Sequence, residues 1–165
     1  MNYVRLFAGP DGESHFEDVT VELAPVDQYT GGVPQVLLSS PRRSTSLTFF
    51  SAPRGWAGDF HPAPRRQFMI KLAGQSELVA SDGEKRQIGP GVALLLEDTT
   101  GKGHYSRVLG PENDEWFVAA LADQQSERSW FHGRSTGRSR WCARRQGRGR
   151  GEGYPRGIGY RSLEG

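Results

Sequence analysis

Residues 58–104 carry the strongest pattern in the sequence. They read GDFHPAPRRQ over 58–67, FMIKLAG over 68–74, GPG over 89–91 and GKGH over 101–104. Two histidines and one amide therefore stand at the edges of short apolar runs, and each run is followed by turn residues. If strands bring these edges together, they form a small polar site in an otherwise apolar barrel.

The candidate elements in the first 125 residues are short, rich in branched or aromatic residues and separated by Gly or Pro. Period-two alternation at 3–7 and 68–72 indicates half-buried strands. The unbroken apolar run at 92–96 is typical of a strand that is buried on both faces. The Asp82-Gly83 pair indicates a hairpin. This spacing favours a sandwich or barrel over helices.

The pattern at 58–104 resembles the motifs of the cupin family. Four positions correspond to the Gly-containing first motif with its two His and one Glu: His61, Ala63, Gln67 and Gly74. The turn at 89–91 resembles the second motif, with His104 in its histidine position. The resemblance implies an all-β, double-stranded β-helix (a jelly-roll barrel of the RmlC-like cupin kind) in which two of four metal ligands are replaced.

The charge of the chain changes sign near residue 125. Residues 1–125 hold 11 Lys and Arg against 16 Asp and Glu, whereas residues 126–165 hold 10 Arg against 3 Glu. We therefore predict a cupin barrel over 1–125 and a disordered tail rich in Arg, Gly and Ser over 126–165. The tail binds RNA, has no specific role, or is an out-of-frame sequence from GC-rich DNA; we prefer the last interpretation to RNA binding.

Cysteine content and hydropathy indicate the cellular compartment in which we expect the protein. Cys142 is the only cysteine, so no intrachain disulfide can form. The sequence has no run of eighteen apolar residues and no N-terminus of the secretory type. We expect a cytoplasmic protein that does not bind membranes. The resemblance also implies a homodimer, which would cover the edge strands of the sheets.

A metal site is one hypothesis for the polar edge of the barrel. The imidazoles of His61 and His104 suit Zn, Fe, Ni or Cu, and a facial iron site needs one carboxylate in addition. Asp59 would share a face with His61 on an extended segment and could supply it, with the weaker amide ligand of Gln67 beside it. A metal-dependent oxygenase or isomerase would use these four residues and one divalent metal (Fe, Zn, Ni or Mn).

The other hypothesis is a metal-free pocket in which His61 or His104 acts as a general base. The candidate ligand-binding residues are Arg65, Arg66, Gln67, Met69 and Lys71. Adjacent arginines on an extended strand point to opposite faces, so at most one of them faces the pocket. An inward lysine is costly unless it is paired, so we expect Lys71 at the rim. We predict binding of a small anionic molecule, with or without metal, and leave turnover open.

Overall fold

The computed structural model describes residues 1–27 and 29–122, and this part of the chain contains β-strands and no helix. The predicted tail at 126–165, with its RNA-binding and out-of-frame interpretations, lies outside the described residues. No helix in the described ranges is long and apolar enough to cross a membrane. The all-β prediction is confirmed.

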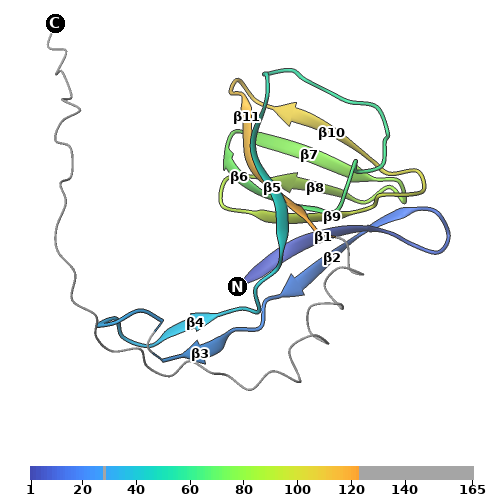
Figure 1. The fold of residues 1–165 in the computed structure, drawn as a ribbon. Helices are drawn as coiled ribbons and strands as arrows, with labels where there is room; N and C mark the ends of the chain where they lie inside the picture. The colour runs from blue at the N-terminus through green and yellow to red at the C-terminus, as the bar shows by residue number, and fades with distance from the viewer. Residues whose placement is uncertain (28, 123–165) are drawn as a thin grey trace, which may run out of the picture.

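Two sheets face each other and enclose the core of the molecule (Figure 1). The larger sheet has the order β2 (Ser14–Thr20), β1 (Asn2–Ala8), β9 (Ala93–Glu97), β6 (Gln67–Ala73), β11 (Asp114–Leu121) and β5 (Ser44–Ala52). The smaller sheet has the order β10 (His104–Leu109), β7 (Gln75–Ala80) and β8 (Lys85–Ile88). A separate pair, β3 (Ala24–Val26) and β4 (Val36–Leu38), lies beside the barrel in Figure 1.

The antiparallel pairing is nested around the hairpin that joins β7 and β8. β7 pairs with β8, β6 with β9, and β5 with β11. The segment between β5 and β6 forms bridges to β10 at Ala57 and His61. A long hairpin that is paired in this way and rolled up is a jelly roll, or double-stranded β-helix. The predicted fold class is therefore confirmed by the strand pairing itself.

Two glycines make turns that other residues would strain. Gly83 has a φ of +98° in the hairpin between β7 and β8, where the Asp82-Gly83 pair predicts a turn. Gly74 joins β6 to β7 with a φ of +75°, and a Cβ there would lie 2.2 Å from the main-chain oxygen of Asn113. The tight turn at Gly74 brings the end of β6 and the start of β7 next to the start of β11.

The core consists of apolar side chains from both sheets. Its main members are Leu6, Leu78, Ile88, Leu94, Leu96 and Trp116. Leu95 is also buried, although it alternates with Leu94 and Leu96 along β9. The prediction that the apolar run at 92–96 is a strand buried on both faces is thus confirmed over 94–96.

The two faces of β6 differ, and the inward face is the one that carries Gln67, as the resemblance implies. Gln67, Met69 and Lys71 turn toward the interior, whereas Ile70 and Leu72 are exposed on the outer face. The expectation that Lys71 lies at the rim is wrong, because Lys71 is only 1% exposed. Acidic and hydroxyl side chains on the neighbouring strands supply partners for its charge in the interior.

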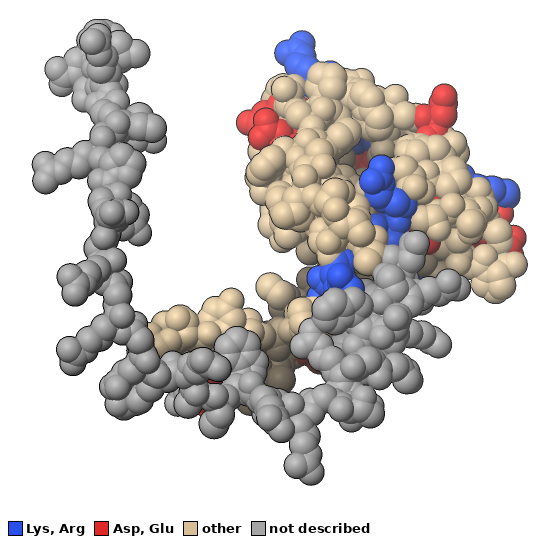
Figure 2. Space-filling view, viewed as in Figure 1, with Lys and Arg blue, Asp and Glu red and all other residues tan. Residues whose placement is uncertain are grey.

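Most of the barrel surface in view in Figure 2 carries no charged side chain.

Candidate functional site

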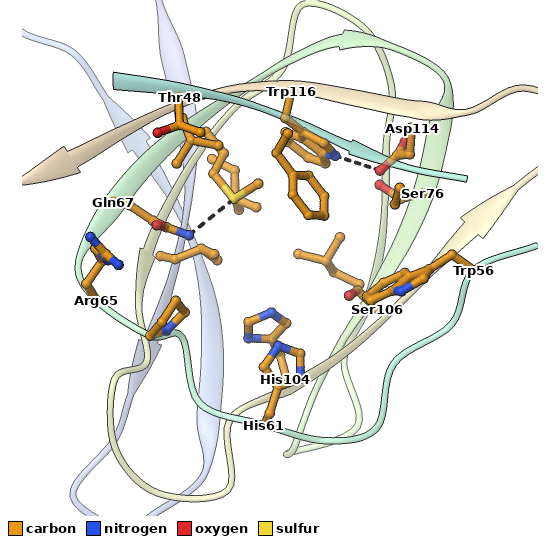
Figure 3. Close-up of a pocket in the computed structure, with 18 of the residues that line it drawn as sticks. Thr48, Trp56, His61, Arg65, Gln67, Ser76, His104, Ser106, Asp114 and Trp116 are labelled. Carbon is orange, nitrogen blue, oxygen red and sulfur yellow. Dashed lines mark hydrogen bonds between the residues drawn. The ribbon is translucent and has the colours of Figure 1, made fainter. Parts of the chain in front are cut away.

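A cavity of about 420 Å³ lies between the two sheets (Figure 3). Most of its wall is apolar. The larger apolar side chains that line it include Phe50, Trp56, Leu78, Leu96, Val108 and Trp116. Polar side chains lie at three places on this wall in Figure 3. His61 and His104 form one group, Asp114 and Ser76 lie on the opposite side of the cavity, and Thr48, Gln67 and Arg65 lie along a third side. This is the pattern of a small-molecule pocket.

The backbone holds the two cavity histidines side by side. His61 and His104 exchange two main-chain hydrogen bonds of 3.0 Å, and their ring centroids are 5.0 Å apart. Gly103 permits this approach, because its φ is +71° and a Cβ would lie 2.1 Å from the carbonyl of His61. The two histidines, which are far apart in the sequence, are therefore brought together as the sequence analysis supposed.

Hydrogen bonds fix which ring nitrogen of each histidine is free. His104 Nδ1 lies 2.6 Å from Asp98 Oδ2, and His61 Nδ1 lies 2.7 Å from the main-chain oxygen of Asp59. A carboxylate and a carbonyl oxygen only accept hydrogen bonds, so each Nδ1 carries the hydrogen. The free nitrogen of each ring is consequently Nε2, which accepts a hydrogen bond when the ring is neutral.

Asp98 is a site residue that the sequence analysis did not identify. It is completely buried behind His104, and its second oxygen, Oδ1, has no hydrogen-bond partner among the described residues. Asp98 directly follows β9, whose apolar run ends at Leu96 and whose last residue is Glu97. A carboxylate placed at the end of such a run, shortly before a histidine, was the available signal. Its role in the structure is to orient the imidazole of His104.

The two adjacent arginines lie in different surroundings. Arg65 is exposed at the cavity wall and makes no ion pair with any described residue. Arg66 does not line the cavity, and its Nε donates to Glu97 Oε1 over 2.8 Å. Gln67 and Met69 both line the cavity, where the amide nitrogen of Gln67 lies 3.6 Å from the sulfur of Met69. Arg65 is therefore the arginine available to a ligand.

Lys71 does not line the cavity, contrary to its place among the predicted ligand-binding residues. Its ammonium group binds Asp114 Oδ1, lies 2.7 Å from Ser76 Oγ and sits 4.0 Å from the ring centroid of Trp116. Burial lowers the pKa of Lys71 below its usual value, while the hydrogen bond to Asp114 acts in the opposite direction. Lys71 lies behind the cavity wall that its three partners form.

The donor atoms do not fit the four-ligand metal site that the resemblance implies. In residues 1–27 and 29–122 no group of three or more His, Cys, Asp or Glu side chains could hold a metal ion. Asp59 is exposed and does not line the cavity. Ala63, at the position of the second histidine, packs into the core. The structure thus brings His61 and His104 together without the carboxylate of Asp59.

No family model and no curated protein matches this chain. Similar solved structures include a Cupin 2 conserved barrel domain protein from Salinispora arenicola CNS-205, with 19% identity over 52% of this chain and 70% of that chain and a TM-score of 0.40. An RmlC-like cupin family protein with a double-stranded β-helix fold from Methanocaldococcus jannaschii has 14% identity over 67% of this chain and 99% of that chain, with a TM-score of 0.42. The Cnp3 cupin domain of Schizosaccharomyces pombe has 12% identity over 78% of this chain and 88% of that chain, also with a TM-score of 0.42. These TM-scores are low, so the assignment of the fold rests on the strand pairing of this chain.

Proposed function

We propose that the barrel binds a small, largely apolar molecule that carries one anionic group. The apolar part of the cavity wall, with the indoles of Trp56 and Trp116, suits a flat hydrocarbon body. A cavity of about 420 Å³ is within the range of pockets that bind small molecules. The barrel interior supplies the burial that would drive such binding.

The observation that carries the anionic group is the unpaired charge of Arg65. Among the charged side chains that line the cavity in the described part of the chain, Arg107 pairs with Glu77 at 2.8 Å and Asp114 pairs with Lys71. Arg65 has no such partner in residues 1–27 and 29–122. A guanidinium binds a carboxylate or phosphate through two parallel hydrogen bonds. Arg65 is thus the group that would hold the anion.

The histidine pair favours a ligand that also carries a hydrogen-bond donor, which Nε2 of a neutral imidazole could accept. Nε2 of a neutral His61 or His104 accepts a hydrogen bond, and it becomes a donor only when the ring is protonated. In Figure 3 Arg65 lies beside Gln67, apart from the two histidines. We assign no reaction to this arrangement, and the proposal is one of binding. The donor set described above gives no support to the metal-dependent oxygenase or isomerase.

The test compares a naphthoate with its neutral amide on the full-length chain. We expect the wild type to bind 2-naphthoate about 10-fold or more tighter than 2-naphthamide, because hydrogen bonds to a charged group contribute about 1.5–3 kcal/mol. The Arg65→Gln variant should lose this difference. Isothermal titration calorimetry, repeated in the presence of a chelator, measures both affinities, and chelation should leave them unchanged.

Arg66→Gln is the matched control, because Arg66 is the next residue and its charge faces Glu97 and not the cavity. This variant should retain the wild-type preference for the carboxylate. Equal binding of 2-naphthoate by the wild type and by Arg65→Gln would contradict the proposal. So would a loss of the preference in Arg66→Gln that matches the loss in Arg65→Gln.

A further inference from the structure

The buried Lys71 ammonium group has three partners. They are Asp114 Oδ1, Ser76 Oγ at 2.7 Å and the face of the Trp116 ring at 4.0 Å from its centroid. An ammonium group donates hydrogen bonds and accepts none. The contact between Lys71 and Ser76 therefore uses a lone pair of the serine oxygen and leaves the serine hydrogen free.

Ser76 has no described acceptor for that hydrogen. Its hydroxyl makes no hydrogen bond other than the one from Lys71 within residues 1–27 and 29–122. Ser76 is only 3% exposed, and it lines the cavity on the side opposite the histidines (Figure 3). A buried hydroxyl donor without an acceptor is unfavourable. The cavity is the space in which an acceptor could meet it.

The neighbouring carboxylate does not compete for a ligand at this place. Asp114 Oδ1 binds Lys71, and Asp114 Oδ2 accepts from Trp116 Nε1 over 2.6 Å. The ion pair of Lys71 and Asp114 is neutral as a whole, so it attracts neither a cation nor an anion strongly. The indole hydrogen of Trp116 is likewise already used. Ser76 is thus the group on this part of the wall that has a hydrogen to donate to a ligand.

We propose that Ser76 forms a second polar subsite, which donates a hydrogen bond to a neutral acceptor such as a carbonyl oxygen on the ligand. This inference rests on the proposed function, because the same molecule would place its anionic group at Arg65. The neutral ion pair of Lys71 and Asp114 gives an anion at Ser76 no compensation for its lost hydration, so the acceptor is neutral. The ligand class is an elongated apolar acid with a carbonyl group at the end remote from its carboxylate.

The test uses two matched pairs of probes that differ only at the remote end. One pair is 6-acetyl-2-naphthoate and 6-isopropyl-2-naphthoate, and the shorter pair is 4-acetylbenzoate and 4-isopropylbenzoate. We expect the wild-type full-length chain to bind an acetyl probe about 3- to 10-fold tighter than its isopropyl partner, as one neutral hydrogen bond provides. The Ser76→Ala variant should bind the two members of that pair equally.

Ser106→Ala is the control, because Ser106 also lines the cavity but does not contact Lys71. It should keep the preference for the acetyl probe. The wild-type comparison alone tests the inference if Ser76→Ala is poorly folded. If the isopropyl and acetyl acids bind equally and both depend on Arg65, the Ser76 subsite is refuted and the proposed function stands. If Ser76→Ala keeps the preference, the subsite is again refuted. If no acid binds in an Arg65-dependent manner, both proposals fail.

Discussion

Replacement of Lys71 by Met should cost much of the stability of the barrel. The side chain of Lys71 is completely buried, and Asp114, its partner, is nearly so. Met keeps an unbranched chain but removes the charge, which leaves the carboxylate of Asp114 buried with Trp116 Nε1 as its remaining donor. Breaking a buried ion pair in this way costs about 3–5 kcal/mol. At roughly 2–4 °C per kcal/mol for a chain of this size, the midpoint temperature should fall by about 6–20 °C.

Chemical denaturation followed by tryptophan fluorescence measures the free energy of unfolding, and a thermal scan gives the midpoint temperature. Lys102→Met is the matched control, since Lys102 also forms an ion pair, with Glu13, but its side chain is 68% exposed. This control should remain close to wild type, because exposed ion pairs contribute little. The Lys71→Met/Asp114→Asn double variant removes both charges, and it should be more stable than Lys71→Met alone.

Two results would refute this reasoning. The first is a Lys71→Met variant that loses no more stability than Lys102→Met, which would mean that burial of the pair is unimportant. The second is a double variant whose loss of stability equals the sum of the losses in Lys71→Met and in Asp114→Asn measured singly. The unpaired carboxylate would then not be the cause.

Two further predictions concern the surface. Hydrogen bonds to Asp11 and then to Asp82 hold the pKa of His15 above its usual value, so the contribution of these contacts to stability should be full below about pH 6.5 and lost as pH rises through the higher folded pKa. A His15→Asn variant should accordingly be less stable than wild type in denaturation at about pH 6 and equal to it at alkaline pH; a gap that does not change with pH would contradict the assignment. We also propose that the chain forms a homodimer through the uncharged edge strand β5, where Leu47 and Phe49 are 64% and 76% exposed. Light scattering after size exclusion should give a dimer mass for the wild type and for the control Leu37→Glu on β4, and a monomer mass for Phe49→Glu; a monomeric wild type would disprove it.

The local signals of the sequence predict a sandwich or barrel, and the resemblance to the cupin motifs adds the double-stranded β-helix. The Asp82-Gly83 pair predicts the hairpin that stands at the centre of the nested pairing, whereas the inward face of β6 follows from the resemblance and not from its alternation. β8 is short and mostly polar, with Arg86 and Ile88 as its more buried positions, so no local pattern predicts it. It becomes a strand because β7 offers it a partner.

The site was predictable only where backbone motifs determine it. His61 and His104 stand out in the sequence because turn residues flank them, and strand pairing brings them together. The environment of Lys71 depends on Asp114, which is distant in the sequence and adjacent in space through β11. No pattern within β6 can show that an inward lysine meets a carboxylate. The cost of burying an unpaired charge was therefore the only guide, and it predicted a position at the rim. Asp98 was missed for another reason: it is close to His104 in the sequence, but nothing in the loop between them shows that its carboxylate turns toward the imidazole.

The nested pairing also determines how this protein can acquire its structure after synthesis. Ser44 at the start of β5 pairs with Leu121 at the end of β11, and β1 lies parallel to β9. Most contacts thus join residues that are far apart in the chain, a topology that folds in milliseconds to seconds and more slowly than helical proteins. On the ribosome, β1 can pair with β2 at once, but β5 and β6 must wait without their partners until β9 and β11 have emerged. During this interval the exposed apolar strands are open to association with other chains, and chaperones that cover such strands would increase the yield of folded protein.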